Sequence, residues 1–266
     1  QIFNFVQLLE NRDPQLVNQR SFYIESTHPV SVIATYDDYR RSGSVTETWA
    51  VQPIETYGTE YSVLTYSGAV ASNSGFLIMA SEDSTEVTFT PSTLWDTPSD
   101  GTTNPVTKML QKYQVFQVYS NSVEDMSGST LTATKPVGVL PFSRRTNVHE
   151  LEPFDTSNAY QTEWRQSALA DVMPSHDLAG TQFYTMPFGP PDTSQVRVIA
   201  TVDGTQIRLN SAAVSTIDAG EYVEMDIGAP SRIDATSPVM AVQIARSGNN
   251  PLIDTIVTLD ASKPNE

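Results

Sequence analysis

Three histidines are the side chains of this 266-residue chain best suited to acid–base or metal chemistry. His176 stands between Ser175 and Asp177, and these are the three residue types of a serine-hydrolase triad. A working triad needs groups that converge from different parts of the fold, so three neighbours in one turn favour a capping cluster instead. His28, before a Pro-Val pair, and His149, in an irregular segment, are interpreted as turn and connector residues.

Carboxylates are plentiful, with 31 Asp and Glu against 15 Lys and Arg. A calcium site needs about six to eight oxygen ligands, several of them from one loop. The acidic clusters lack Asp-X-Asp-X-Asp spacing and are interpreted as solvated turn acids, with calcium left as the alternative. They are Asp37-Asp38, Glu82-Asp83 with Glu86, and Asp254 with Asp260. A paired-carboxylate glycosidase would need a cleft that the sequence does not indicate. We therefore expect neither a cofactor nor enzymatic activity.

One segment combines cations and an aromatic in a chain otherwise short of cations. Arg144, Arg145, Trp164 and Arg165 lie there, and Arg and Trp are favoured at interface hot spots. These four residues are the candidate interaction surface. The alternative is that Trp164 seals the junction between two structural units. The same segment holds the best helix candidate, residues 158–170, with apolar side chains at i, i+4 spacing.

The composition of the chain excludes several kinds of partner and site and favours a β fold. The formal net charge of −16 repels phosphate backbones, which argues against nucleic-acid binding. The chain has no Cys, so disulfides, thiolate metal sites and Cys nucleophiles are excluded. No apolar run approaches the roughly 18 residues of a membrane span. Abundant Thr, Ser and Val favour strands over helices.

A stretch with a central Pro-Val pair occurs three times. The pairs are Pro29-Val30, Pro136-Val137 and Pro238-Val239, so the spacings are 107 and 102 residues. A period of this size indicates a domain-sized repeat. Each copy reads as two short strands joined at the Pro, and Pro suits an edge strand because it cannot donate to a central ladder.

Two further signatures recur in the same order. Gly58-Thr59 and Gly180-Thr181 each end a turn and begin a strand with an aromatic residue. Residues 76–89 and 196–209 then read as strand, tight turn and strand, which predicts a hairpin in each. The Gly spacing is 122 residues, and we assign the 20 extra residues of the first copy to the polar loop 91–111, which carries Trp95.

These patterns predict an all-β fold of tandem, pseudo-repeated, β-sandwich-like units with a short helical connector. We expect a partial unit at residues 1–50, the tail of a repeat, and unit one at 51–144. A connector follows at 145–172, unit two at 173–248, and a C-terminal strand and tail at 249–266.

The ordered motifs resemble the N-terminal domain of the IgG Fc-binding protein family, found in mucin-like secreted proteins. Residues 53–65, 126–139 and 172–183 carry the resemblance, which covers about residues 21–248. Members carry Cys just after the central Pro-Val motif, whereas this chain has Arg144 and Arg145 there. The resemblance implies an extracellular or cell-surface, non-catalytic binding or structural module, and it carries over no antibody-binding residue.

We therefore expect a module of a larger adhesive, mucin-like or filamentous assembly. Its expected partners are other proteins or matrix and mucus components, with self-association through the incomplete unit at 1–50 as a further route. The alternative is a glycan-directed β-protein, a lectin or a glycoside hydrolase, suggested by Trp95 beside Asp96 and Trp164 beside Glu163.

Overall fold

The computed structural model describes residues 17–19, 21–38, 45–67, 73–93, 103–120, 123–146, 167–188, 194–245 and 256–259. Within these ranges the chain is nearly all β, as predicted, and forms two curled seven-stranded sheets and a two-stranded ladder. The described helices are two single 3-10 turns, η1 (Ile54–Thr56) and η2 (His176–Leu178). None of the described helices is long and apolar enough to cross a membrane.

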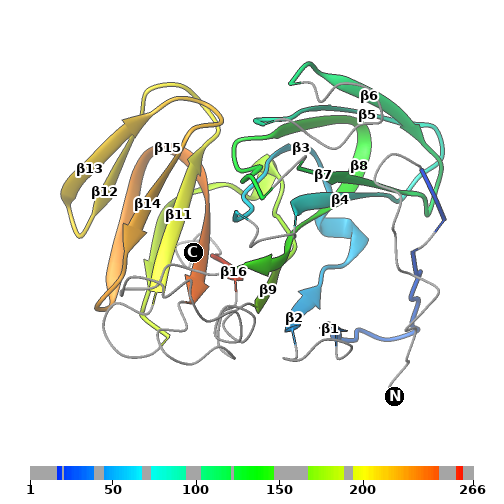
Figure 1. The fold of residues 1–266 in the computed structure, drawn as a ribbon, viewed down its shortest axis with the longest axis horizontal. Helices are drawn as coiled ribbons and strands as arrows, with labels where there is room; N and C mark the ends of the chain where they lie inside the picture. The colour runs from blue at the N-terminus through cyan, green and yellow to red at the C-terminus, as the bar shows by residue number, and fades with distance from the viewer. Residues whose placement is uncertain are drawn as a thin grey trace, which may run out of the picture.

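The strands follow one another in two blocks, one per large sheet (Figure 1). The ladder pairs β1 (Val32–Asp38) with β2 (Val45–Val51). Sheet one contains β3 (Gly58–Ser62), β4 (Ser74–Ala80), β5 (Thr85–Thr90), β6 (Val106–Leu110), β7 (Val115–Tyr119), β8 (Thr130–Thr146) and β9 (Ser167–Ala170). Sheet two contains β10 (Gly180–Thr185), β11 (Ser194–Ala200), β12 (Thr205–Leu209), β13 (Ala212–Ile217), β14 (Tyr222–Asp226), β15 (Ser231–Ala245) and β16 (Ile256–Leu259).

The two large sheets have the same strand order. Sheet one runs β6-β5-β8-β4-β7 with β3 and β9 also on β8, and sheet two runs β13-β12-β15-β11-β14 with β10 and β16 on β15. The repeated sequence motifs meet each other in both sheets, because Gly58 pairs with Val137 and Gly180 pairs with Val239. The Gly-Thr and Pro-Val motifs therefore recur together because each Gly-Thr strand pairs with the Pro-Val strand of its own sheet.

In both large sheets the Pro-Val stretch is one long strand at the centre, so the predicted pair of short edge strands is wrong there. The first copy differs, because Pro29 and Val30 precede the shorter strand β1. Strand β8 pairs with β5 up to Ala133 and with β4 from Val137 onward. Pro136 lies at this change of partner, where no N–H is needed for the ladder. In both sheets a hydroxyl donates to the Pro carbonyl, from Ser81 to Pro136 and from Thr201 to Pro238.

The predicted hairpins also differ from the structure. Strands β4 and β5 follow one another closely, but each pairs with β8 rather than with the other, and β11 and β12 use β15 in the same way. The reason is the length of the central strand, which offers its first half to one neighbour and its second half to the next.

The extra length of the first copy lies in more than one place. Strands β4 and β11 start 120 residues apart, whereas β7 and β14 start 107 apart, so 13 extra residues lie in the predicted loop region. Five more lie between β7 and β8, because Pro136 and Pro238 are 102 apart. This second insertion, which includes Asp125 and Ser127, bears directly on the junction between the sheets.

The predicted connector helix is corrected where the structure describes it. Residues 158–166 lie outside the described residues, but Ser167–Ala170 is strand β9, which pairs with the end of β8. Ala168, Leu169 and Ala170 are buried there. Backbone pairing with an otherwise open end of β8 outweighs the helical spacing of the side chains.

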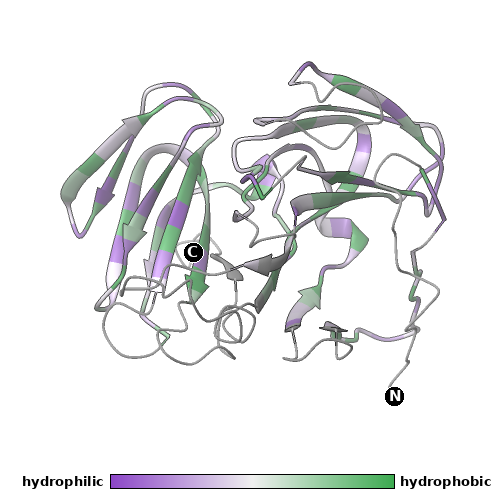
Figure 2. Cartoon of the chain, in the orientation of Figure 1, coloured by the Kyte–Doolittle hydropathy of each residue, from purple (hydrophilic) through white to green (hydrophobic). Residues whose placement is uncertain are grey.

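One hydrophobic core spans both sheets. It is built mostly from sheet one but includes Ile199, Met240, Val242 and Ile244 of sheet two. Sheet two has a second core of its own, around residues such as Phe183, Val196 and Val198. Strand β11 and the second half of β15 are therefore buried on both faces. Figure 2 shows hydrophobic positions on both strands, interrupted by hydrophilic ones. The two sheets share a packed interface rather than a flexible link.

Gly75 tests how tightly sheet one is packed. A Cβ at this position would lie 2.0 Å from the carbonyl oxygen of Val118, which is backbone and has little freedom to move. We expect Gly75→Ala to lower the free energy of unfolding by about 2–3 kcal/mol, measured by urea denaturation. Val214→Ala, at an exposed site on β13, should stay within about 0.5 kcal/mol. Equal stability of the two variants would contradict this packing.

Candidate functional site

The structure describes only part of the surface predicted from the sequence. Arg144 and Arg145 belong to the end of β8, but their side chains lie outside the described residues. Trp164 and Arg165 also lie outside them, as do Trp95 and His149. Their role as an interaction surface stays a prediction, and the polar cluster that the structure describes lies elsewhere.

That cluster centres on Arg197, in the middle of β11, whose side chain is only 5% exposed although it is charged. Alternation along the strand explains its direction: Val196 and Val198 face the core of sheet two, while Ile199 joins the core shared with sheet one. Arg197 lies on the same side of the strand as Ile199, so it points at sheet one. It occupies the junction between the sheets.

Partners from both sheets satisfy the Arg197 guanidinium. Nη1 donates to Asp125 Oδ2 at 2.6 Å and to the Thr65 carbonyl at 2.6 Å, both on the sheet-one side. Nε donates to Glu224 Oε2 at 2.8 Å, on β14. The guanidinium carbon lies 4.3 Å from the centre of the Tyr66 ring and 5.0 Å from that of Tyr222. A planar cation between two rings and two carboxylates suits arginine better than lysine.

Asp125 is held in place by its own hydrogen bonds. Its Oδ1 accepts from Thr65 Oγ1 at 2.7 Å and from the backbone N–H of Ser127 at 2.9 Å. Burial alone would raise the pKa of Asp125, but the Arg197 charge and these hydrogen bonds outweigh burial and lower it. Burial opposes the charge of Arg197 too, and Asp125 and Glu224 outweigh it and raise its pKa. Both groups are ionised at neutral pH.

Backbone contact completes this part of the junction. Gly128, in the inserted loop, has φ of +90°, and a Cβ there would lie 2.8 Å from the Gly220 carbonyl oxygen. Glycine is needed because an L side chain would meet that backbone and is strained at this φ. The inserted loop before β8 therefore fits against the start of β14.

A second polar contact joins sheet one to η2, the turn that precedes β10. Ser62 Oγ on β3 lies 3.0 Å from His176 Nε2, and His176 Nδ1 lies 3.7 Å from Glu60 Oε2. The fold thus brings a serine, a histidine and a carboxylate together, in a set that sequence neighbours did not suggest. Ser62 is 2% exposed, so its hydroxyl cannot approach a substrate carbonyl. The set joins β3 to η2 rather than activating a nucleophile.

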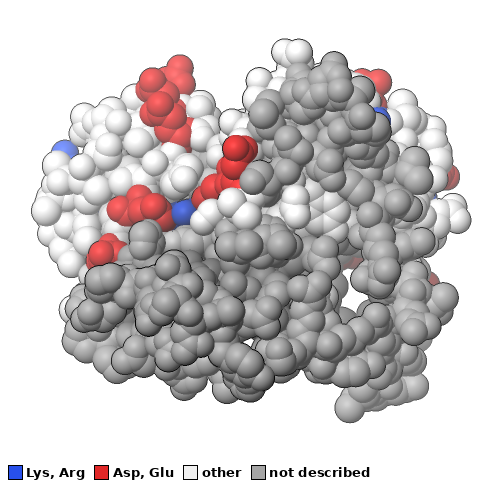
Figure 3. All heavy atoms as spheres, viewed as in Figure 1, with Lys and Arg blue, Asp and Glu red and all other residues white. Residues whose placement is uncertain are grey.

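Metal binding gains no support in the part of the chain that the structure describes. No group of three or more His, Asp or Glu side chains gathers there as a metal site would require. Glu82 lies 3.9 Å from Lys135, and Asp83 accepts the backbone N–H of Lys112. Figure 3 shows acidic side chains near the hollow between the two halves.

At the junction itself, acidic side chains pair with Arg197, and these ion pairs hold the two sheets together.

The sequence contained a signal for this junction that the motif reading missed. Arg197 is a lone charge within an apolar strand, and the repeat places Leu77 at the same position of β4. The register confirms this equivalence, since Leu77 pairs with Gln117 and Arg197 pairs with Glu224. A charge that replaces an apolar residue of the other copy, together with an acidic insertion, indicates a contact that only one copy makes.

Removing the buried cation should destabilise the protein strongly. We expect Arg197→Met to lower the free energy of unfolding by about 3–4 kcal/mol, because Asp125 keeps a poorly solvated charge without its partner. Adding Asp125→Asn should recover part of that loss. Arg232→Met is the matched control, because Arg232 pairs with Asp234 at the surface and its loss should change the free energy of unfolding much less. A loss for Arg197→Met no larger than the control would contradict the assignment.

His176 predicts a pH dependence of stability. Burial lowers its pKa, and Glu60 and Asp177 offset only part of that effect. A histidine whose pKa falls on folding contributes stability above its unfolded pKa, about 6.5, and that stability is lost as the pH drops toward the folded value. We expect His176→Gln to flatten the fall in unfolding free energy between about pH 7 and pH 5. His28→Gln, at an exposed histidine, is the control, and an unchanged slope in His176→Gln would refute this role.

Comparison with known proteins identifies the family of the chain. A search of the curated proteins and a search of the solved structures found no match. The family model described as IgGFc binding protein matches residues 47–262, which is most of the chain and includes both large sheets. This is a family of binding proteins. The chain therefore belongs to the IgG Fc-binding protein family.

Proposed function

We propose that this chain is an extracellular, non-catalytic module that binds other proteins and forms part of a larger adhesive or mucin-like assembly. Family membership supports a binding role. The observation that carries the structural part of the proposal is the buried Arg197–Asp125 pair, which crosses from one sheet to the other. A fixed pair of sheets keeps loops from both of them in one arrangement, as a docking surface requires.

The predicted domain plan is part of this proposal. Residues 51–144 and 173–248 are proposed as two sandwich-like units, with 145–172 as the connector between them. The repeated strand order of sheets one and two supports this division. Strands β9 and β16 follow the long strands β8 and β15 in the same way that β2 follows β1, which supports a partial unit at 1–50.

The proposed binding surface is the end of β8 and the segment after it. It comprises Arg144, Arg145, Trp164 and Arg165, cations and an aromatic in a chain whose net charge is −16. A partner with an acidic and aromatic surface patch would complement these side chains. The candidate partners are the IgG Fc region, after which the family is named, and mucin glycoproteins.

Binding to immobilised partners tests the proposal. By biolayer interferometry, we expect saturable binding to IgG Fc or to a mucin glycoprotein. We expect the double variant Arg144→Ala and Arg145→Ala to weaken that binding about tenfold or more. Arg208→Ala, an exposed arginine on β12, is the matched control and should leave affinity unchanged. Equal affinity of the double variant and the control would show that Arg144 and Arg145 are not part of the binding surface. Absence of binding to either partner would overturn the binding role.

A further inference from the structure

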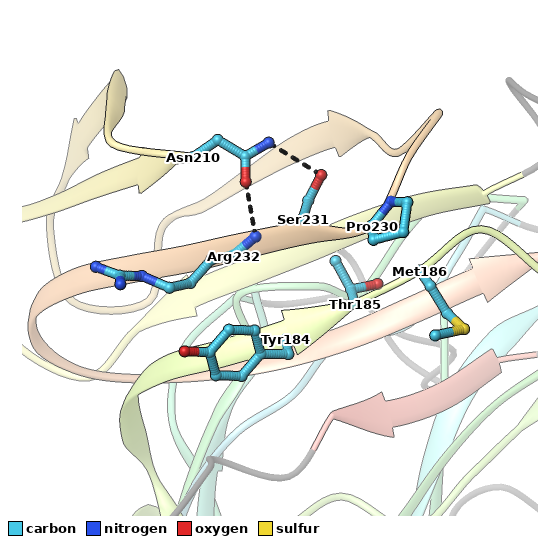
Figure 4. Close-up of a pocket in the computed structure, with 7 residues that line it drawn as sticks. All are labelled: Tyr184, Thr185, Met186, Asn210, Pro230, Ser231 and Arg232. Carbon is cyan, nitrogen blue, oxygen red and sulfur yellow. Dashed lines mark hydrogen bonds between the residues drawn. The ribbon is translucent and has the colours of Figure 1, made fainter.

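Sheet two presents an exposed apolar face beyond the end of β10. The side chains of Tyr184, Met186 and Phe188 are 63%, 65% and 49% exposed. Tyr184 and Met186, with Pro230 and Arg232, border an open cavity of about 460 Å³ (Figure 4). Its lining comes from β10, β15 and the residues next to β10, β12 and β15. Large apolar side chains gathered at one site indicate an interaction surface.

The same face of sheet one is already an interface. The Gly58–Gly180 equivalence places Leu64 at the position of Met186 and Tyr66 at that of Phe188. Leu64 is 0% exposed and Tyr66 is 4% exposed. Leu64 lies in the core shared with sheet two, and Arg197 of sheet two stacks on Tyr66. Equivalent residues are thus covered by the following sheet in one copy and uncovered in the other.

The mode of contact recurs at the front of sheet one. The Pro29–Pro136 equivalence places Ser21 at the position of Gly128, and the β7–β14 equivalence places Tyr113 at that of Gly220. Ser21 Oγ donates to the Tyr113 carbonyl at 2.7 Å, and Gly128 lies against the Gly220 carbonyl. Asn18 also pairs through its backbone with Val115, the first residue of β7. The segments before the first two Pro-Val stretches therefore contact the following sheet at equivalent positions.

We propose that the face formed by Tyr184, Met186, Phe188 and Pro230 docks a further unit of the same repeat, joined in tandem after β16. The face continues the series of interfaces that begins at residue 18. Its occupant is a β unit that covers this face as sheet two covers Leu64 and Tyr66. The inference deepens the assembly part of the proposed function and does not depend on which protein is bound.

The face also indicates the chemistry of that unit. The loop that supplies Asp125 has its counterpart in the shorter link 227–230, which contains no acid. Arg232 is already paired through two contacts with Asp234. The docking unit should therefore carry an apolar residue where sheet two has Arg197, as sheet one does with Leu77.

The docking proposal can be tested with a longer protein in which a second copy of the two sheets follows the first. Because the chain has no Cys, one introduced cysteine is the only thiol that can react. Residues 1–259 are followed by residues 52–266, so that Gln52 follows the end of β16 as it follows the end of β2. Met186→Cys is placed in the first half only, and its rate of maleimide labelling is compared with that of Met186→Cys in the 266-residue chain. We expect labelling to slow by about tenfold or more in the tandem.

Two controls give the labelling rate of a covered site and show whether the added half has folded. Leu64→Cys in the 266-residue chain gives the rate for a face that is already covered. Leu64→Cys in the appended half alone reports whether that half has folded. An unchanged Met186→Cys rate with a protected appended Leu64→Cys would overturn the proposal. A reactive appended Leu64→Cys would overturn it too, because the upstream face should support the front of the added unit.

A second copy of the chain is the competing occupant. If it covers this face, labelling of Met186→Cys in the 266-residue chain will slow as protein concentration rises, and the tandem-unit proposal fails. We expect a rate independent of concentration. Fc and mucin binding do not enter this readout, so failure here leaves the binding proposal standing.

Discussion

The structure depends on a charge buried between two sheets. Arg197 loses nearly all contact with water, and such a charge is tolerated only where paired charges and hydrogen bonds replace the solvent. Asp125, Glu224 and the Thr65 carbonyl do so from both sides of the junction. If the two sheets moved apart, the pair would lose its geometry, and the shared apolar core would open with it. The buried ion pair and the shared apolar core therefore fix the position of one sheet relative to the other.

The two sheets share one strand order but differ in the residues that they place at the junction. Each has a long central strand that changes partners at a proline, and each pairs the Gly of Gly-Thr with the Val of Pro-Val. The differences lie where the copies meet. Sheet two has Arg197 where sheet one has Leu77, and sheet one has a longer loop with Asp125 where sheet two has a short link. The two copies therefore differ at the residues that form the contact between them.

The sequence predicted the fold class, the family resemblance and the repeated motifs, because these depend on local patterns of strand residues and turns. It did not predict strand pairing. The hairpins at residues 76–89 and 196–209 were wrong because close succession in sequence says little about which neighbour a long strand takes. The helix proposed up to residue 170 was wrong at Ser167–Ala170, where pairing with β8 decides the conformation.

The candidate site was missed for a related reason. Arg197, Asp125 and the Ser62–His176 contact join residues 72 to 114 positions apart, and no motif spans such distances. Arg144, Arg145, Trp164 and Arg165 stay a prediction, because their side chains lie outside the described residues. Comparing the two copies position by position would have pointed to Arg197, since a difference between repeats marks what only one of them does.

We conclude that the two sheets fold as one cooperative body held by the buried junction. Differential scanning calorimetry of the intact chain tests it most directly. We predict one transition whose calorimetric and van't Hoff enthalpies agree. Two resolved transitions, or a calorimetric enthalpy about twice the van't Hoff value, would show that the sheets unfold independently of each other.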